Sequence, residues 1–429
     1  MRTGIRRKAF KDRMYPTKAP EQNRFLVLNR GPERYNAAVQ ERRDAYELMV
    51  KRHPSYYDPH TRKELTKAHA IKYSAQQNAL PEIKHEIRPE YEEVAAHVLQ
   101  EVLKRLDQAF QASFRRIREG QTPGYPRFQG QGRSSSFTYP DKAGWKLLDD
   151  PTRPPHKKGI VKVRLQLSTS GTVKLQLHRD LLGKMKTLTI KQEADQWDAV
   201  FSCQQDKPEP LPVSYEDIGS DRGITHFAAL STGEFSESPK YDRKAEKKIN
   251  ALQQAKDRTM PRSHRRKKAA KALGKASRKV RNPRQDFLHT QSRKLVKRYQ
   301  IIAREKLQTE HLVQRPKPKQ DETTGEYFPN AAAAKAGFNT SMTDARWATF
   351  AEMLRVKAAW AGREIVFVHP NYTSHMCPTW GTRRPKTLEE RWHSCTCGCE
   401  LERDTASAKV IFDLGKPTLA GARPTLATV

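Results

Sequence analysis

The spacing of apolar residues divides the chain into stretches with different predicted structures. Between residues 36 and 118, apolar side chains recur every three or four positions, which is the period of an amphipathic helix. The clearest helix is expected over 97–118, where one stripe is formed by Val98, Val102, Leu106, Ala109 and Phe110. We expect this stripe to pack into a core, because the apolar stripe of a helix is normally its buried face.

Beyond residue 120 the pattern changes from a helical period to an alternating one. Gly and Pro residues break the helix over 120–132. Apolar and polar residues then alternate in four short segments: 159–167, 171–177, 185–191 and 197–203. This alternation predicts an antiparallel sheet or a small barrel, which is a scaffold and does not by itself indicate a function.

The third stretch, after residue 212, alternates strands with helices. The expected elements are a strand, tight turn and strand over 217–230, a buried strand over 298–307, another strand over 364–369, a helix over 342–362, and loop or tail over 325–338 and after 415. Strands that alternate with helices indicate an α/β layer.

The charge of the chain points to a partner. Its 429 residues, enough for about three domains, carry 81 Lys and Arg against 48 Asp and Glu, a net charge of +33. Ten basic residues and no acidic ones lie within 262–281, inside a helical stretch over 242–299. Such a run is often only a solvated face, but a surplus of this size favours a polyanion, and nucleic acid is the usual one. We expect a nucleic-acid backbone at Lys104, Arg105, Arg265, Arg266, Lys267, Lys268, Lys271, Arg278 and Lys279.

An acidic membrane surface is the competing partner for a basic chain. The sequence has no run of about 18 apolar residues to span a bilayer, and residues 1–10 lack the apolar core of a signal peptide. Four of the five cysteines lie in one C-terminal stretch: Cys377, Cys395, Cys397 and Cys399. A local cluster predicts a metal site rather than a disulfide framework. Together these features predict an intracellular protein with no membrane partner.

Three acidic residues stand at the ends of predicted elements. Asp221 follows a strand, Glu305 ends the apolar run of another strand, and Asp404 opens a helical segment. Three carboxylates that meet in an α/β sheet can hold two divalent cations about 4 Å apart, an arrangement that hydrolyses phosphodiesters. Taken singly, each residue can equally be a helix cap or an exposed strand end.

Several segments of the chain resemble a known family. DIGSDRGITHFAALSTGEF (217–235), RQDFLHTQSRKLVKRYQIIAREKL (284–307), the stretch from TDARW to TSHMC (343–377) and CGCELERD (397–404) are similar to the TnpB proteins of bacterial insertion sequences. FKDRMYPTKAPEQ near the start and GYPRFQ with SSSFTYP fit as well, so the resemblance covers nearly the whole chain. These proteins are RNA-guided nucleases related to the miniature type V CRISPR effectors.

The resemblance implies a multidomain fold with α+β and α/β parts. The implied domains are a wedge-type β-barrel over 1–35 and 119–212, a helical recognition domain over 36–118, a RuvC-like (RNase H-type) nuclease domain over 213–370 and 400–415 with the basic helical insertion 242–299, a zinc-ribbon-like, target-nucleic-acid-binding insertion over 371–399, and a tail over 416–429.

The resemblance also implies an activity, an RNA-guided DNA endonuclease that depends on Mg²⁺ or Mn²⁺. Asp221, Glu305 and Asp404 fall on the three acidic positions of its catalytic, Mg²⁺-binding site. The partners that the resemblance implies are a guide RNA and double-stranded target DNA, with no small-molecule substrate. The implied location is the bacterial cytoplasm, at the nucleoid. Base pairing reads the target, while the protein reads a short flanking motif, for which Gln100 and Thr138 are the matched positions. Both residues can equally be ordinary polar residues of a helix and a loop.

The chain departs from the family at the cysteine ribbon and after the third acid. Two C-x-x-C knuckles hold zinc in the family, but Trp380 and Ser394 replace one cysteine of each knuckle here. Cys377 and Cys397 keep matched positions, and Cys395, Cys399, His375 and His393 are the available substitutes. Zinc is therefore doubtful, and the metal-free alternative has Trp380 packing the loop. Ala406 and Ser407 replace the Asn and Ala that usually follow the acid.

Two other functions remain open on the sequence alone. An RNA-guided DNA-binding protein with weak or absent cleavage, acting as a repressor or targeting factor, is the alternative that the eroded ribbon favours. A cut-and-paste transposase is the third, and it does not account for a guide RNA.

Overall fold

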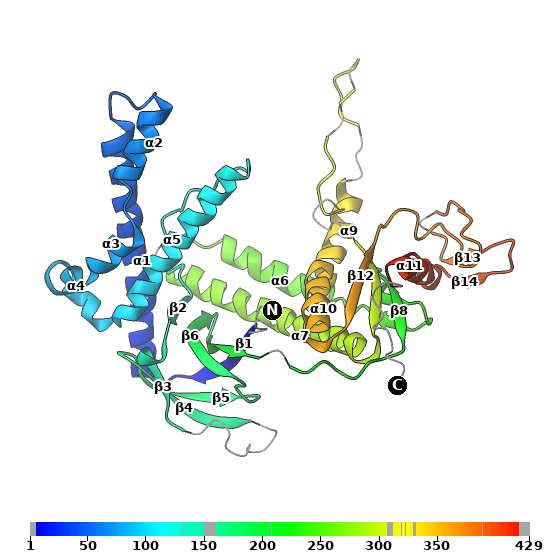
Figure 1. Ribbon diagram of the computed structural model, residues 1–429, viewed down its shortest axis with the longest axis horizontal. Helices are drawn as coiled ribbons and strands as arrows, with labels where there is room; N and C mark the ends of the chain where they lie inside the picture. The colour runs from blue at the N-terminus through cyan, green and yellow to red at the C-terminus, as the bar shows by residue number, and fades with distance from the viewer. Residues whose placement is uncertain are drawn as a thin grey trace, which may run out of the picture. The chain divides into compact units, whose positions relative to one another are not determined.

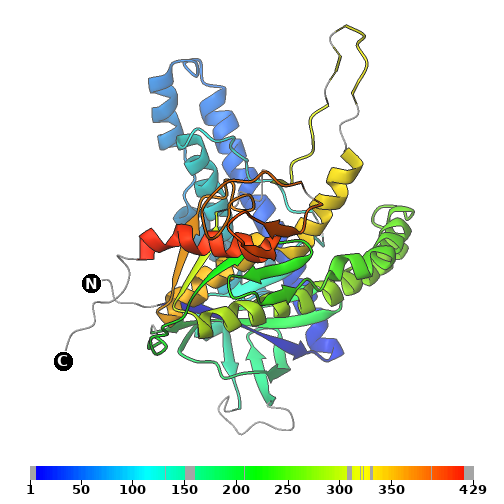
Figure 2. The same ribbon diagram turned by 90° about the vertical axis from the view of Figure 1, so that its right-hand side faces the viewer.

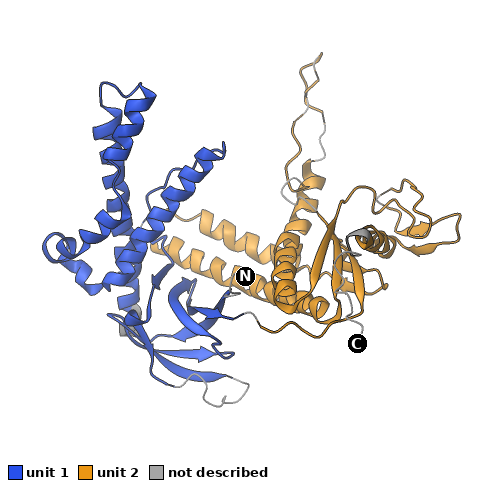
Figure 3. Ribbon diagram, viewed as in Figure 1, with its two compact units in different colours: residues 1–207 blue, residues 208–429 orange. Residues whose placement is uncertain are grey.

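The computed structural model describes residues 6–130, 132–149, 160–206, 208–306, 312–318, 320–321, 323–328, 332–387 and 389–419. The chain divides into two compact units, Met1–Lys207 and Pro208–Val429 (Figure 3). Each unit has its own buried apolar cores. Within the described part of the chain, no helix combines the length and the apolar character that crossing a membrane requires.

The first unit contains seven antiparallel strands that curl into a nearly closed barrel (Figure 1). The strands are β1 (Arg6–Tyr15), β2 (Ser136–Tyr139), β3 (Trp145–Leu147), β4 (Val161–Leu167), β5 (Gly171–Leu177), β6 (Lys184–Glu193) and β7 (Gln196–Gln205). Their order across the sheet is β2-β6-β7-β1-β5-β4-β3. In β4 the apolar residues are buried and those between them are exposed, as expected for a strand with one covered face. The alternating segments are confirmed as strands.

The helices of the first unit begin earlier in the chain than the apolar period indicates. They are α1 (Lys18–Tyr46), α2 (Pro59–Ala68), α3 (Tyr73–Asn78), α4 (Leu80–Glu82) and α5 (Ala96–Arg118). The sequence pattern predicts helix only from residue 36, whereas α1 starts at Lys18. Gly31 and Pro32 lie buried inside α1 and hide its period, because Pro lacks an amide hydrogen and normally ends a helix.

Helix α5 has a wider buried face than the predicted stripe. Val98, Leu106 and Phe110 are buried as expected, but Leu99 and Leu103 are fully buried too, while Val102 is only partly covered. The cause is that α5 packs against both α1 and β2, so two sides of the helix are covered.

The second unit is a mixed five-stranded sheet with helices on both faces. Its strands are β8 (Asp217–Asp221), β9 (His226–Leu230), β10 (Phe235–Glu237), β11 (Ile301–Glu305) and β12 (Glu364–Val368), in the order β10-β9-β8-β11-β12. β8, β11 and β12 run parallel, and β9 pairs antiparallel with both β8 and β10. A separate hairpin pairs β13 (Trp392–Ser394) with β14 (Glu400–Glu402). The predicted strand-turn-strand, the buried strand β11 and the further strand β12 are confirmed.

Five helices complete the described part of the second unit. They are α6 (Tyr241–Asp257), α7 (His264–Arg298), α9 (Ala332–Ala345), α10 (Trp347–Ala361) and α11 (Arg403–Leu419). On one sheet face Ile302 packs with residues of α7 and α10, and on the other Ile301 and Ala303 pack with Ile411 of α11. Figure 2 looks onto α11, shown in red in front of the strands. Strand β11 is therefore covered on both faces.

Three sequence-based boundaries in this unit are corrected by the structure. The helix expected over 342–362 is two helices, because Arg346 adopts a left-handed conformation (φ 52°) between α9 and α10. α9 begins at Ala332, so the last part of the loop expected over 325–338 is helical. α11 continues to Leu419, past the expected start of the tail at residue 416.

Glycines allow α11 to approach the sheet closely. A Cβ atom at Gly219 of β8 would lie 2.0 Å from the Ala408 carbonyl oxygen and 2.7 Å from Phe412 Cβ. On the helix, a Cβ at Gly415 would lie 2.9 Å from Ala303 Cβ. Backbone meets backbone at Gly219, so a larger side chain there would displace the whole helix.

We predict that Gly219→Ala destabilises the second unit by about 1–3 kcal/mol, because the added methyl group overpacks the contact with α11. Thermal or urea unfolding measures the loss. Gly337→Ala is the matched control: Gly337 lies in α9 with no atom within 4 Å of its Cβ position, so Ala there should be neutral or stabilising. Equal stability of the two variants would contradict the close packing of α11.

Candidate active site

Two of the three predicted acids end neighbouring parallel strands. Ser220 of β8 lies opposite Arg304 of β11, and each strand ends at its next residue, Asp221 or Glu305. Asp221 points to the same face as Gly219, and Glu305 to the same face as Ala303, because side chains alternate along a strand. That face is the one covered by α11. Both acids are 8% exposed.

The third acid, Asp404, reaches the same place from the first turn of α11. Glu402 caps this helix, since its Oε2 accepts hydrogen bonds from the amides of Asp404 (2.9 Å) and Thr405 (3.0 Å). A Cβ at Gly223, in the turn after β8, would lie 3.4 Å from Asp404 Oδ2. The structure therefore brings the three predicted acids together at the carboxyl ends of β8 and β11.

The electrostatics of this acidic cluster suit a cation. Burial raises the pKa of Asp221 well above its usual value, and the charges of Glu305 and Asp404 raise it further. Burial also raises the pKa of Glu305, although a hydrogen bond from Thr373 and the charge of Arg222 act against it. Oxygen ligands from several carboxylates are the donors that Mg²⁺ and Mn²⁺ prefer, and a cation would relieve the repulsion among them. The donor set fits a divalent metal.

Sequence reasoning missed the residues that hold the acids in place. The Arg222 amide donates to Asp221 Oδ1 (2.7 Å), and its guanidinium Nη2 donates to the Glu305 carbonyl oxygen (2.7 Å). The Thr373 hydroxyl donates to Glu305 Oε1. Arg222 follows an acid directly and offered a weak signal, whereas nothing in the sequence around Thr373 points to Glu305.

The cysteine segment, residues 371–402, contains a second candidate metal site. Sulfur or ring nitrogen atoms of Cys377, His393 and Cys399 lie within 4.8 Å of one another, and so do those of Cys377, Cys395 and Cys397. Cys377 is common to both groups and is buried. His375, another predicted substitute, belongs to neither group. The predicted cysteines therefore do gather, and His393 joins them.

The donors of this cluster fit zinc. His393 is fully buried and its Nδ1 lies 2.5 Å from Lys386 Nζ, while its Nε2 has no hydrogen-bond partner among the residues that the structure describes. The amide of Cys397 lowers the pKa of the Cys395 thiol to about 6, so that thiol is ionised near neutral pH. Thiolate and imidazole are the ligands of structural zinc sites. Trp380 is 63% exposed, so the expectation that it packs this loop is wrong.

The predicted basic residues of the second unit all lie on α7 and differ in exposure. Arg265, Lys267, Lys268, Lys271 and Lys279 are exposed, and Arg278 is half-buried.

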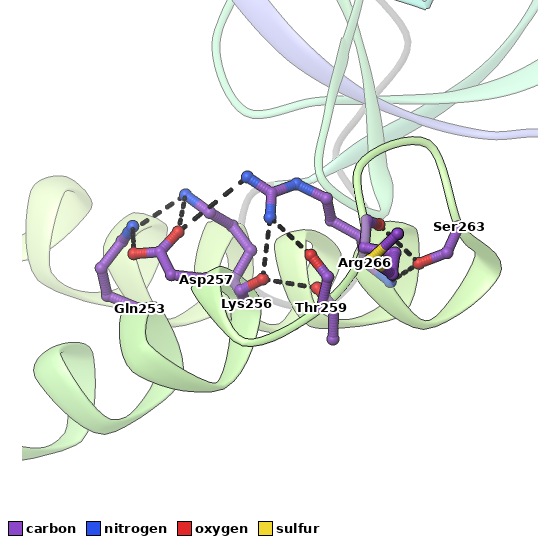
Figure 4. A network of polar contacts seen from close by, with 7 residues as sticks. Gln253, Lys256, Asp257, Thr259, Ser263 and Arg266 are labelled. Carbon is purple, nitrogen blue, oxygen red and sulfur yellow. Dashed lines mark hydrogen bonds and ion pairs between the residues drawn. The ribbon is translucent and has the colours of Figure 1, made fainter.

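Arg266, in contrast, closes the turn between the two helices (Figure 4). Its Nη1 donates to the carbonyl oxygens of Lys256 (3.0 Å) and Thr259 (2.9 Å), and its amide donates to Ser263 Oγ (3.1 Å). The structure thus gives Arg266 a role in holding the turn.

The predicted motif-reading and backbone residues of the first unit also differ in exposure. Thr138 on β2 is buried, and its hydroxyl bonds Arg105 Nη2 (2.5 Å) and Thr189 Oγ1 (2.8 Å). Arg105 donates in addition to the Ser136 carbonyl oxygen (3.3 Å). Gln100 is half-buried and Lys104 is exposed on α5. Contact of these residues with nucleic acid stays a prediction, and the side chains of Thr138 and Arg105 are engaged with each other.

Two family models match separate parts of the chain. The OrfB_IS605 model, described as a probable transposase, matches residues 200–315, which include Asp221 and Glu305. The model of the Cas12f1-like TNB domain matches residues 347–411, which include the cysteine segment and Asp404.

Two relatives carry a name that states an activity. A Streptomyces pristinaespiralis protein named "Putative RNA-guided DNA endonuclease" is 31% identical over 244 residues, 56% of this chain and 56% of that protein. An Escherichia coli (strain K12) protein named "Putative RNA-guided DNA endonuclease InsQ" is 26% identical over 312 residues, 73% of this chain and 71% of that protein. The chain thus spans about half the length of the Streptomyces relative.

Two solved structures can be aligned with nearly the whole chain, at low identity and low TM-score. The Cas12f1–sgRNA–target DNA complex covers 96% of this chain and 100% of its own, with a TM-score of 0.31 and 14% identity. The mini-RNA-guided endonuclease CRISPR-Cas_phi3 covers 96% and 93%, with a TM-score of 0.45 and 9% identity.

We predict that Asp221→Asn stabilises the metal-free protein, and more so at pH 8 than at pH 5. The pKa of Asp221 is raised in the folded state. The wild type therefore loses stability as pH rises from the unfolded value of about 3.9 through the raised folded value, and the uncharged amide does not. Unfolding in EDTA measures this as a higher melting temperature, by roughly 2–4 °C for each kcal/mol recovered.

Asp413→Asn is the control for this prediction, because the Asp413 side chain on α11 is 43% exposed and its carboxylate pairs with Lys416 at 2.6 Å. Its melting temperature should follow that of the wild type at both pH values. A melting temperature of Asp221→Asn at or below that of the wild type at pH 8 would contradict the buried, crowded carboxylate.

Proposed function

The chain belongs to the TnpB/IS605 OrfB transposase family, and from this membership we propose that it is an RNA-guided DNA endonuclease dependent on Mg²⁺ or Mn²⁺. It reads a short flanking motif in duplex DNA and cleaves the target that matches its guide. The observation that carries the proposal is the meeting of Asp221, Glu305 and Asp404 at the carboxyl ends of β8 and β11.

We assign domain roles on the same basis. The mixed sheet with α7, α10 and α11 is a RuvC-like nuclease domain, and the cysteine segment within it is a zinc ribbon that binds target nucleic acid. The barrel of the first unit is a wedge domain, and the helices α1 to α5 form a recognition domain. The +33 net charge and the exposed Lys and Arg of α6 and α7 support a role for these helices in holding guide RNA and DNA backbone.

The chain's own residues prepare the site for hydrolysis. Asp221, Glu305 and Asp404 would hold the divalent metal, which supplies Lewis-acid stabilisation and an activated water when bound. Burial by α11 excludes bulk water from the carboxylates, Arg222 and Thr373 orient two of them, and the Glu402 cap fixes the helix end that carries the third. A charge developing on the phosphate then meets oriented groups in a dry site.

The structure refines how the flanking motif would be read. Thr138 is buried, so we propose that it acts by holding Arg105 rather than by touching DNA. Gln100 on α5 remains the proposed contact with the motif, and the exposed Lys104 of the same helix remains a proposed contact with the nucleic-acid backbone. Base pairing with the guide supplies the sequence recognition.

We predict that Asp221→Ala and Glu305→Ala abolish cleavage while guided DNA binding stays within about threefold of the wild type. The reason is that a metal-binding carboxylate acts on the transition state and not on the heteroduplex. The measurement uses protein purified at low salt with the RNA encoded beside its gene, a matched DNA target, and cleavage and binding assays run in parallel.

Asp413→Ala is the control, since it removes a partly exposed acid from the same helix that carries Asp404. Equal loss of binding and cleavage in Asp221→Ala would make the acids structural. Guided binding without cleavage by the wild type would support the alternative, a targeting protein, and failure to bind the RNA would exclude both.

We also propose that the cysteine segment holds one zinc, with Cys377 and Cys397 among its ligands and the others drawn from Cys395, Cys399 and His393. Elemental analysis should give about one zinc per chain, and Cys377→Ser should lose it and melt this segment, because structural zinc contributes folding free energy directly. Cys203→Ala, a buried cysteine of the barrel, is the control that keeps the metal. The proposed zinc site would be contradicted if the wild type contained no zinc and a chelator did not change its unfolding.

A further inference from the structure

The carboxylate of Glu305 is held by a residue of the segment that follows β12. We propose that Thr373 is a positioning residue that fixes Glu305 through its hydroxyl and so couples the fold of the cysteine segment to the nuclease centre. This inference rests on the proposed function of Glu305 as a metal ligand.

The hydrogen bond from Thr373 occupies one of the two carboxylate oxygens of Glu305. Thr373 is 2% exposed, and its Oγ1 donates to Glu305 Oε1. The same Oγ1 lies 3.3 Å from the Pro370 carbonyl oxygen, a longer and weaker contact. A hydroxyl group has a single proton to donate, so Thr373 donates it to Glu305 Oε1, the nearer acceptor. Oε1 is thereby held and Oε2 stays available as a ligand.

The other groups around Glu305 do not perform this task. Arg222 bonds the backbone carbonyl oxygen of Glu305 rather than its carboxylate. Arg304, the preceding residue, lies on the opposite face, where its guanidinium stacks over the Phe350 ring at 4.8 Å. Among the residues that the structure describes, Thr373 alone donates a side-chain hydrogen bond to this carboxylate. Its loss would leave the Glu305 side chain free to rotate.

The position of Thr373 is set by the backbone turn that leads into the cysteine segment. The amides of His375 (2.8 Å) and Met376 (3.0 Å) both donate to the Tyr372 carbonyl oxygen, and Tyr372 itself is left-handed (φ 65°). Directly after this turn, the Cys377 amide donates to the Thr382 carbonyl oxygen at 2.9 Å. Thr is also stiff at χ1, so the turn fixes where its hydroxyl points. The first cysteine, Cys377, thus lies only four positions after Thr373.

The other end of the cysteine segment holds Asp404 in a similar way. β14 runs into α11, and Glu402 at the end of β14 caps the amide of Asp404. The Arg403 guanidinium donates to the carbonyl oxygen of Glu390 (3.0 Å), and the Arg403 amide donates to that of Arg391 (2.8 Å). Two of the three acids are therefore positioned by residues at the two ends of one small segment.

The test compares Thr373→Val, which keeps the shape and removes the donor, with Thr373→Ser, which keeps the donor. In the protein–RNA complex, Thr373→Val should retain guided DNA binding in EDTA but need roughly 10–100-fold more Mg²⁺ for half-maximal cleavage, the usual effect of losing a partner of a metal ligand. Thr373→Ser should restore the wild-type Mg²⁺ dependence. Thr349→Val, at an exposed position of α10, is the matched control and should behave as wild type.

A second readout does not depend on cleavage. Mn²⁺ should raise the melting temperature of the wild-type complex more than that of Thr373→Val, with the shift in Asp221→Ala taken as the background from metal bound by RNA. An unchanged Mg²⁺ dependence and an equal Mn²⁺ shift in Thr373→Val would overturn the proposal. So would a failure of Thr373→Ser to rescue, because the residue would then be structural. If the wild type does not cleave, the proposed function fails, and the Mn²⁺ shift still decides the role of Thr373.

Discussion

The crowding of three like charges in one corner is the constraint on which the second unit depends. Burial raises the pKa of Asp221, the charges of Glu305 and Asp404 raise it further, and only the docking of α11 brings Asp404 to the two acids of the sheet. The fold offsets the cost of this crowding with specific contacts: bare glycine backbone under α11, a helix cap at Glu402, and the Arg222 side chain. A cluster of carboxylates held in this way is arranged for a cation.

Much of the fold follows from local patterns. The strands of both units coincide with alternating or apolar segments, because each strand covers one or two faces with neighbouring layers. Prediction failed where tertiary packing overrode a local signal. Pro32 lies inside α1, and a left-handed Arg346 divides a single apolar stripe into two helices. Neither event can be read from the residues alone, since each depends on what packs around the backbone.

The candidate site shows the same division between local and distant causes. Its three acids were predictable because each stands at the end of a strand or at the start of a helix. The residues that orient them were not, because Thr373 lies 68 positions from Glu305 and meets it only through the folded sheet. His393 joins the cysteine cluster for a similar reason: only the folded structure shows that its ring is fully buried and that its Nε2 has no hydrogen-bond partner within the described part of the chain.

The contacts of Arg266 affect how strongly nucleic-acid binding by this protein would depend on salt. Its guanidinium donates hydrogen bonds inside the turn between α6 and α7. The guanidinium groups of Arg105 and Arg304 likewise contact other residues of the protein. Only Lys and Arg side chains that reach a phosphate release counterions. Each such contact lowers the slope of the logarithm of the binding constant against the logarithm of the salt concentration by about 0.9. The formal charge of +33 therefore overstates the number of ions that nucleic acid would displace. A salt titration of binding would count the outward-facing charges, not the composition.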